Sequence, residues 1–496
     1  MAEAGRQKEM EYADVVIVGA GIAGFAAVKT LAAEAPHLRV CVLEARDRVG
    51  GRTVTTTLAM PDGHLVPIDI GASWLHGGVD AGVSERHPLA VAAEGRATFK
   101  MTSSGNMWVC RDTHIEIATF SEPAGTFLSH AEGGALDTGI GPLMDEMLAC
   151  CRANPSWSAG ACAQACYNRF ASRGEDPALL AGWRFVLRLH EIWLGLEMHE
   201  VPGLEWEDMA TVERGWGDLE GGHYVAAGGL GHLMRALWGS AAGRHADVRL
   251  GCKVVGIARP SYAGISTRPS ASDRSQRPAN VVVEYDGSNG RQQTLSCGAL
   301  ICTIPVGCLQ RSLHTMWTPK LSKVKQQAIA RTQMTRYIKV VMVYDIAKPF
   351  WHDNVEWLGF LARDGGEARE DFHLFFSYWR LKHITVLVAY ACGRLAEEVE
   401  ALGEVKAGDR VTRTLRKMYG PRAVPQPWKV LISRWLQDEH SLGAYPLADE
   451  PTIAEIAEPS WDGTVKILQS TFLDWMPCFP QPGLLDSHSA YRFANP

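Results

Sequence analysis

Three glycines and one acid near the start of the chain have the spacing of a dinucleotide-binding segment. Gly19, Gly21 and Gly24 follow an apolar run that ends at Val18, and Glu44 directly follows a second apolar run. In such a segment the first glycine permits a tight turn out of a buried strand, and the second lets the backbone approach a pyrophosphate. The third lets the helix pack closely on the sheet, while an acid about twenty residues later bonds a ribose hydroxyl. The sequence therefore predicts a strand, a turn and a helix that bind a dinucleotide.

A second glycine pair follows at once and narrows the choice of dinucleotide. Residues 46–52 read Arg-Asp-Arg-Val-Gly-Gly-Arg. This segment resembles the extended flavin adenine dinucleotide signature of the flavin-containing amine oxidases, in which the arginine after the glycine pair touches the diphosphate. The resemblance assigns that contact to Arg52. Nicotinamide enzymes have no need of this second motif, so the expected cofactor is FAD.

Composition and charge indicate a globular protein with more than one domain. The chain has 496 residues, of which 46% are hydrophobic and 21% charged, and a chain of this length is too long for a single core. The net charge of −6 gives no reason to expect a nucleic-acid partner. The first fourteen residues lack the apolar centre of a signal peptide, and the most apolar early run is the dinucleotide strand and helix, so no membrane span is expected. We expect a cytoplasmic location; a peroxisomal location for a form with a different C-terminus is the alternative.

The cysteines and histidines show none of the common metal spacings. Twelve cysteines are scattered without a CxxC pair, and the seventeen histidines form no HExxH motif. Zinc and thiol-redox chemistry are therefore disfavoured, and no metal site is expected. Cys41 and Cys302 lie in apolar strand patterns, as expected for core thiols in a reducing compartment.

A segment after the glycine motifs matches the part of the same family that lies beneath the flavin ring. Residues 71–76 read Gly-Ala-Ser-Trp-Leu-His. The resemblance implies cofactor contacts from Gly71, Ala72, Ser73 and Trp74. His76 stands where polyamine-oxidising members carry a histidine or an acid near the substrate. Its alternative is an ordinary loop histidine.

Lys339 is the candidate for the reaction itself. It lies in the apolar stretch 337–344, where a charged side chain is costly unless it has a partner. The stretch resembles the strand that carries the family's lysine, which holds a water against the flavin N5 atom. A position at a strand edge is the alternative.

Four further positions complete the site that the resemblance implies. Glu197 follows a helical pattern, and the resemblance makes it the candidate for the acid that faces the substrate tunnel in plant polyamine oxidases; a solvated helix-end glutamate is the alternative. Val254 would contact adenine through its backbone, and Trp435 and Tyr445 would lie beside the flavin. Monoamine oxidases carry their covalent flavin cysteine just before that tyrosine, but here the residue is Ala444. FAD is therefore expected to be noncovalent.

The resemblance covers roughly residues 13–468 and implies an α/β fold of two domains. One is a discontinuous Rossmann-type FAD-binding domain and the other an α/β substrate-binding domain. The FAD-binding domain is expected at 12–84, 221–310 and 430–468, and the substrate-binding domain at 85–220 and 311–429. Residues 469–496 carry prolines at positions 477, 480 and 482 and show no helical period. We expect an irregular tail there, in place of the family's last flavin-contacting helix.

Together these features imply an FAD-dependent polyamine oxidase. It would oxidise a C–N bond of spermine, spermidine or their acetylated forms to an imine, which water splits into an aldehyde and a shorter amine. Dioxygen would be reduced to hydrogen peroxide. Lys339 would hold the water, and His76 and Glu197 would align the cationic substrate. A histone-demethylating relative is disfavoured because no long coiled-coil insert interrupts the chain. The alternatives are a flavin-poor, catalytically impaired variant that acts through protein contacts, favoured by the tail, and an oxidase of other primary or secondary amines. The oligomeric state does not follow from the sequence.

Overall fold

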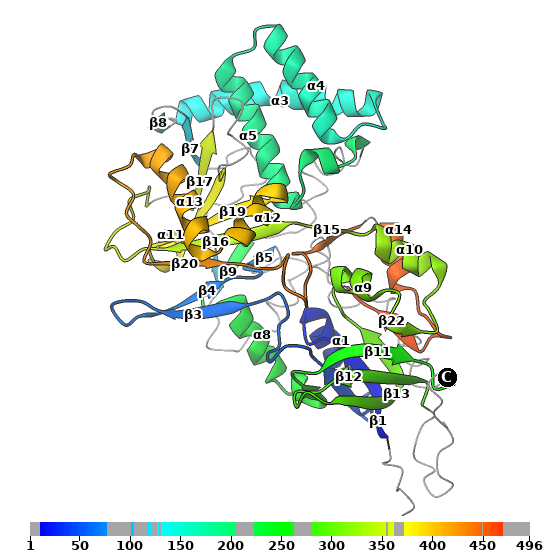
Figure 1. Cartoon of the computed structure of the whole chain (residues 1–496). Helices are drawn as coiled ribbons and strands as arrows, with labels where there is room; N and C mark the ends of the chain where they lie inside the picture. Colours follow the sequence, from blue (N-terminus) through cyan, green and yellow to red (C-terminus); the bar gives the residue numbers. More distant parts are fainter. Residues whose placement is uncertain are drawn as a thin grey trace, which may run out of the picture. The chain divides into compact units, whose positions relative to one another are not determined.

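The computed structural model (Figure 1) describes residues 10–76, 101–103, 117–121, 126–127, 130–204, 206, 223–261, 279–353, 356–361, 372–448 and 450–469. The chain divides into two compact units. The first comprises residues 1–54, 231–334 and 438–496, and the second comprises residues 55–230 and 335–437. In the described part of the chain, no helix combines the length and apolarity needed to cross a membrane.

The first unit is built on an eight-stranded mixed sheet. Its strand order is β10-β2-β1-β13-β12-β11-β14, and β22 also pairs with β13. The strands are β1 (Glu11–Val18), β2 (Val40–Leu43), β10 (Ala246–Arg249), β11 (Lys253–Ala258), β12 (Val281–Asp286), β13 (Gln292–Cys302), β14 (Trp317–Thr318) and β22 (Val465–Ile467). The pairs β1–β2, β1–β13 and β2–β10 are parallel, whereas β11, β12 and β13 form an antiparallel meander. Parallel strands covered on both faces read as continuous apolar runs, which is why residues 15–18 and 40–43 carry no polar residue.

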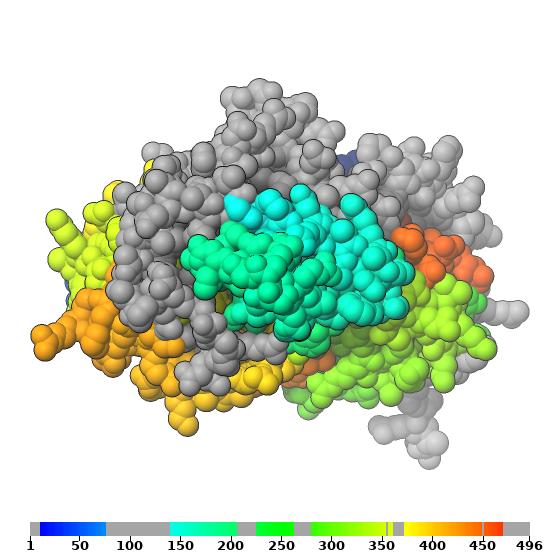
Figure 2. Space-filling model, turned by 90° about the horizontal axis from the view of Figure 1, so that it is seen from above, coloured from blue at the N-terminus to red at the C-terminus, as the bar shows by residue number. Residues whose placement is uncertain are grey.

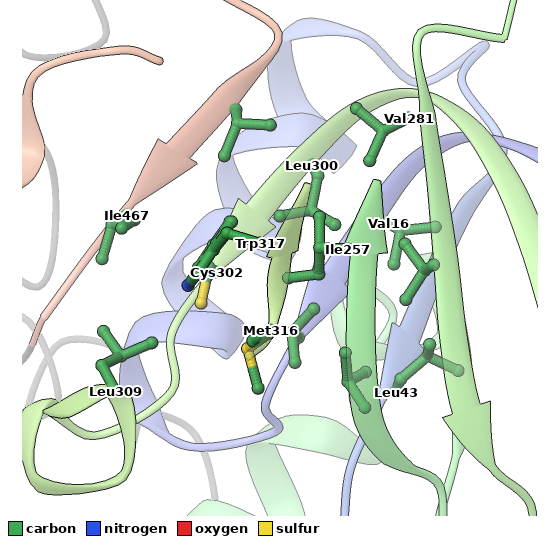
Figure 3. Close-up of a cluster of buried hydrophobic side chains, with 14 of the residues drawn as sticks. Val16, Leu43, Ile257, Val281, Leu300, Cys302, Leu309, Met316, Trp317 and Ile467 are labelled. Carbon is green, nitrogen blue, oxygen red and sulfur yellow. The ribbon is translucent and has the colours of Figure 1, made fainter. Parts of the chain in front are cut away.

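Helices and one large apolar cluster complete this unit. The helices are α1 (Ile22–Glu34), α8 (Leu230–Trp238), η2 (Gly243–His245), α9 (Val306–Ser312), α10 (Lys323–Arg331) and α14 (Glu450–Ala457). The strands β15 (Gln333–Met334) and β21 (Pro446–Leu447) form a separate two-stranded sheet in the same unit. Figure 3 shows side chains from several strands meeting in the core, among them Val16, Ile257, Leu300 and Ile467. This core fixes the end of β1, where the glycine turn begins.

The second unit contains a seven-stranded sheet and two small sheets. The large sheet has the order β20-β16-β19-β18-β17-β7-β8, and the small ones are β3-β4 and β5-β9-β6. The strands are β3 (Thr55–Ala59), β4 (Leu65–Asp69), β5 (Trp74–His76), β6 (Met101–Ser103), β7 (Ile117–Ser121), β8 (Thr126–Phe127), β9 (His223–Ala226), β16 (Tyr337–Val343), β17 (Trp357–Leu361), β18 (Leu374–Ser377), β19 (Val386–Cys392) and β20 (Lys429–Ile432). Strand β16 lies inside the sheet because it pairs with β19 on one side and β20 on the other.

Three helices of this unit pack against one another, as Figure 2 shows in cyan and blue-green. They are α3 (His130–Ala153), α4 (Ala159–Ser172) and α5 (Pro177–Leu194), and the remaining helices are η1 (Met198–Glu200), α11 (Trp379–Lys382), α12 (Gly393–Leu402) and α13 (Glu404–Tyr419). The ends of α5 follow the usual capping chemistry: Asp176 accepts a bond from the Ala178 N–H, Pro177 occupies the first turn, and Gly195 closes the helix at φ 66°. Ser158 caps α4 in the same way.

The two units differ from the predicted domains at several boundaries. Residues 55–76 and 223–230 group with the second unit, because Val66 and Ile68 of β4 pack in its core and β5 pairs with β9. Residues 311–334 group with the first unit, because β14 pairs with β11 and α10 packs on α14. Residues 430–437 group with the second, where β20 extends the sheet through β16. The family resemblance assigned these segments to the domain whose ligand they are expected to bind. The contacts between strands and helices assign them to the unit against which they pack.

Of the predicted irregular tail, only Gln469 lies among the described residues. Its side-chain amide donates to the Ile304 carbonyl at 2.6 Å. Residues 470–496, which carry the prolines, lie outside the described part, so the tail stays a prediction.

Candidate active site

The glycine turn in the first unit has the geometry that close approach of a phosphate requires. Gly19 has φ 106°, a left-handed conformation that suits glycine. A Cβ atom on Gly24 would lie 2.1 Å from the Gly19 carbonyl oxygen, so a larger residue would push the helix off the turn. At Gly21, the N-cap of α1, a Cβ would meet no described atom within 4 Å. The turn therefore needs Gly19 and Gly24 for its own packing, whereas Gly21 leaves open space at a helix N-terminus, where phosphates bind well.

Glu44 fastens this turn to the end of β2. Its buried carboxylate accepts the Ala20 N–H at 2.7 Å through Oε2 and the Arg46 N–H at 2.9 Å through Oε1. Each carboxylate oxygen accepts more than one bond, so both keep capacity for a ribose hydroxyl. The bond from Ala20 gives Glu44 a structural role that the sequence did not reveal.

The second glycine motif is held by a loop almost four hundred residues away in the chain. Arg46 donates to both carboxylate oxygens of Asp438, at 2.8 and 3.0 Å, and to Ser441 Oγ at 2.9 Å. Arg52 Nη1 donates to the Ala444 carbonyl at 2.7 Å. Burial lowers the pKa of Arg52 to about 10, so its guanidinium stays charged at neutral pH. A guanidinium group has five N–H donors, and the bond to Ala444 uses one of them. The remaining donors could bind a diphosphate.

The structure describes three other predicted cofactor residues, but their surroundings do not test a contact with the cofactor. Val254 is buried in β11, beside the irregularity between Val254 and Gly256. Tyr445 is half-buried and follows Ala444 into β21. Trp435 is buried in the second unit. Their roles toward the cofactor stay predictions.

In the second unit the fold brings Lys339 together with the predicted Gly71–Trp74 segment. Lys339 lies in β16 with only 7% of its surface exposed. Its Nζ donates to the Gly71 carbonyl at 2.6 Å and to Ser73 Oγ, while its backbone N–H bonds Ser433 Oγ at 2.8 Å. The strand-edge alternative is wrong, because β16 is paired on both sides. A buried lysine with polar partners in an otherwise apolar strand is a functional-site candidate.

The Lys339 amine gains and loses its proton at a pH close to the physiological range. Burial lowers the pKa of Lys339 to about 8, and the charge of Asp69 opposes that effect. A neutral amine has two N–H donors and one lone pair. Its two acceptors, the Gly71 carbonyl and Ser73 Oγ, match those two donors. The neutral form can therefore keep its contacts and still accept a proton or a bond from water.

Asp69, at the end of β4, is a residue of this centre that sequence reasoning missed. It is fully buried, and Oδ1 accepts bonds from Thr55 Oγ1 and from the Leu230 N–H at 3.0 Å. Burial raises the pKa of Asp69, while Lys382 and Lys339 oppose the rise. Its Oδ2 atom has no hydrogen-bond partner among the described residues. The available signal was its place two residues before Gly71, inside the segment that carried the resemblance.

Aromatic side chains surround the same segment. The Trp74 ring stacks on Trp357 at 6.1 Å and meets Phe376 edge-on at 4.9 Å. Trp357 also stacks on Tyr390 at 5.7 Å. Ser73 bonds the Tyr378 hydroxyl, and burial raises the pKa of Tyr378. Trp74 is thus fixed by ring contacts, and the neighbouring Ala72 is half-buried.

The two predicted substrate-aligning residues fare differently. His76 ends β5, where its backbone pairs with His223; its side chain lies outside what the structure describes. Glu197 is half-buried rather than solvated, and Oε1 accepts the Arg394 N–H at 2.7 Å at the start of α12. It also forms a capping box with Glu200 on η1. These contacts give Glu197 a structural part, and its role toward a substrate stays a prediction.

The comparisons with known proteins decide the family. The sequence model of flavin containing amine oxidoreductases matches residues 176–459, and that of NAD(P)-binding Rossmann-like domains matches residues 17–86. The chain belongs to the flavin containing amine oxidoreductase family. The predicted resemblance is confirmed, and FAD is the expected cofactor. The open space beside Gly21, the Glu44 carboxylate and the half-buried Arg52 guanidinium fit that cofactor.

Similar proteins include two kinds of enzyme. Polyamine oxidase 4 of Oryza sativa subsp. japonica is 30% identical over 435 residues, which cover 87% of this chain and 77% of that protein. Polyamine oxidase 2 of Arabidopsis thaliana is 26% identical, with 89% and 79% covered. Lysine-specific histone demethylase 1 homolog 1 of Arabidopsis thaliana is 27% identical, but the match spans 88% of this chain and only 46% of that protein.

A solved structure shares the fold. Putrescine oxidase bound to putrescine matches with a TM-score of 0.60 and 18% sequence identity, over 92% of this chain and 93% of that one. The predicted fold class, an α/β flavin amine oxidase fold with a Rossmann-type domain, is therefore confirmed.

Proposed function

We propose that this protein is an FAD-dependent oxidase of polyamines. The observation that carries the proposal is Lys339, a buried amine with a pKa of about 8 that is held against the Gly71–Trp74 segment. Relatives named polyamine oxidases align over about three quarters of their own length, which supports polyamines as the substrate class.

The chain's part in the reaction is to position groups and to manage a proton. Bound FAD supplies the acceptor for the two electrons that leave the substrate's C–N bond. The reacting nitrogen must be neutral, because an ammonium group has no lone pair to support that loss. Neutral Lys339 keeps its two N–H bonds to Gly71 and Ser73 and offers its lone pair to a water or to a departing proton. Buried Asp69 compensates the charge when Lys339 is protonated.

The products follow from the chemistry of the substrate. Oxidation of the C–N bond gives an imine, and water hydrolyses it to an aldehyde and a shorter amine. Dioxygen takes the two electrons in turn and leaves as hydrogen peroxide. Ala444 provides a methyl group, not a thiol, at the position before Tyr445, which supports noncovalent FAD. We further propose His76 and Glu197 as acceptors for the distant ammonium groups of the substrate.

A substrate panel tests the proposal. Peroxide and aldehyde are measured with spermine, spermidine, acetylspermine, putrescine and a peptide that carries dimethyl-lysine. We expect turnover with at least one of the first three, and its loss in Lys339→Met. Lys325→Met is a matched control, because Lys325 is also buried with a pKa of about 8 but lies in the first unit, bonded to the Ile456 carbonyl at 2.6 Å. Peroxide from the methylated peptide alone would favour the demethylase relatives, and FAD-loaded protein inert toward every amine would favour the impaired variant.

A further inference from the structure

The segment after β2 carries both kinds of side chain that distinguish one dinucleotide from another at the adenosine ribose. Glu44 directly follows β2, and Arg46 comes two residues later. In dinucleotide-binding folds an acid at this place bonds a free ribose hydroxyl, whereas a nearby arginine accommodates a phosphate on that hydroxyl. The glycine turn and Arg52 face only the diphosphate, which both kinds of ligand share. Selection between a free and a phosphorylated ribose therefore depends on whether the Arg46 guanidinium is available.

The fold commits the Arg46 guanidinium to a loop from the other end of the chain. Its Nη1 donates to Asp438 Oδ2 at 2.8 Å, while Nη2 donates to Asp438 Oδ1 at 3.0 Å and to Ser441 Oγ at 2.9 Å. Two parallel bonds of this kind are the geometry in which a guanidinium binds either a carboxylate or a phosphate most strongly. Because Asp438 already occupies that position, a phosphate would have to displace its carboxylate.

Both partners of this ion pair are also held by other bonds. The Arg46 N–H donates to Glu44 Oε1 at 2.9 Å. The Asp438 carbonyl accepts the Ser441 N–H at 2.9 Å, and Asp438 Oδ1 accepts the His440 N–H at 2.9 Å. The side chains of Arg46 and Asp438 are only 14% and 21% exposed, and a partly buried pair is screened much less than an exposed one. The pair is thus a fixed part of the site.

We propose that Asp438 is a specificity-determining residue of the cofactor site, because it occupies Arg46 and so keeps the site selective for a dinucleotide with a free ribose hydroxyl. A ribose phosphate would have to displace Asp438 and would also meet the negative charge of Glu44. The adenosine ribose of FAD carries free hydroxyls and needs neither change. NADP and NADPH carry the phosphate, so they are excluded although they offer a diphosphate to the same glycine turn. This selectivity does not depend on the proposed oxidation of polyamines.

The test measures binding of ADP-ribose and of its 2′-phosphate to the full-length apoprotein by isothermal titration calorimetry. The quantity compared is the ratio of the two dissociation constants, because a purely structural defect would weaken both ligands and leave the ratio unchanged. We expect wild type to prefer ADP-ribose. Asp438→Asn keeps an oxygen for the His440 N–H but removes the charge that holds Arg46. It should shift the ratio toward the phosphorylated ligand by roughly tenfold, the effect of one hydrogen bond between charged groups.

Two further variants locate the effect. Glu439→Gln is the matched control, because it removes one negative charge from the same loop, yet Glu439 bonds Lys253 Nζ, at 2.6 Å. This control should keep the wild-type ratio. Asp438→Asn combined with Arg46→Met should lose the shift toward the phosphorylated ligand, because the released guanidinium is its source.

Several results would overturn the proposal. They are equal binding of both ligands by wild type, a wild-type ratio in Asp438→Asn, and an equal shift in Glu439→Gln, which would make the effect one of net charge. A double variant that keeps the shift would move the phosphate contact away from Arg46. Apoprotein that binds neither ligand would overturn the proposal together with the FAD assignment. None of these measurements uses amine turnover, so a failure of the proposed oxidase function would be seen separately.

Discussion

Replacement of Lys339 by methionine should change how the stability of the protein depends on pH. Its pKa is 10.5 in the unfolded chain and about 8 in the folded protein. Between these values the unfolded chain binds more protons, so wild-type stability rises with pH. A shift of this size makes the buried ammonium cost roughly 3 kcal/mol at pH 7, and about 2 kcal/mol of that cost is relieved by pH 9.5. Methionine has no such ionisation.

The measurement compares urea unfolding of wild type and Lys339→Met at both pH values, followed by tryptophan fluorescence. We expect the free energy of unfolding of wild type to gain about 2 kcal/mol relative to the variant between pH 7 and pH 9.5. Wild type should show a comparable gain relative to Lys325→Met, because burial also lowers the pKa of Lys325 to about 8. The Lys325→Met variant should nevertheless keep the turnover of wild type. A difference between wild type and Lys339→Met that stays constant with pH would refute the assignment of Lys339 as a buried, weakly basic amine.

Four further substitutions separate fold from function. Gly21→Ala should leave the melting temperature unchanged but lower FAD affinity at least tenfold, because the added Cβ meets no described atom yet blocks the phosphate. Gly24→Ala should destabilise the apoprotein, because its Cβ would lie 2.1 Å from the Gly19 carbonyl oxygen. Equal stability losses in the two variants would contradict this reasoning. Arg52→Met should weaken FAD binding more at low than at high salt, measured by fluorescence titration, and a salt-independent loss would contradict a phosphate contact. Glu197→Ala should lower stability by about 1 kcal/mol through loss of the cap at α12 and should also raise KM for spermine; an unchanged KM would contradict the proposed contact with the substrate.

Local pattern was sufficient to predict the cofactor segment. The apolar run that ends at Val18, the glycines of the turn and Glu44 occupy one short stretch, and their spacing alone determines a strand, a turn and a helix. The sequence also favoured a partnered position for Lys339, because an isolated charge in an apolar stretch is costly, but only the pairing of β16 on both sides excluded a strand edge.

The rest depends on contacts between segments far apart in the chain. Arg46 meets Asp438 across 392 positions, and Lys339 meets Ser73 across 266. No periodicity in one segment reports such a partner. Asp69 was overlooked because its bonds from Thr55 and from the Leu230 N–H form only in the folded chain. Glu197 was assigned by resemblance to the substrate, but its contacts are those of a cap.

The central claim is that this chain holds FAD and oxidises polyamines through the centre around Lys339. The most direct measurement is the visible spectrum of the purified, FAD-reconstituted protein during anaerobic addition of spermine or spermidine, with Lys339→Met and Lys325→Met in parallel. We predict that the absorbance of oxidised flavin bleaches in wild type and Lys325→Met, and at least tenfold more slowly in Lys339→Met. A protein that takes up no FAD, or that stays yellow with every polyamine, would contradict the account.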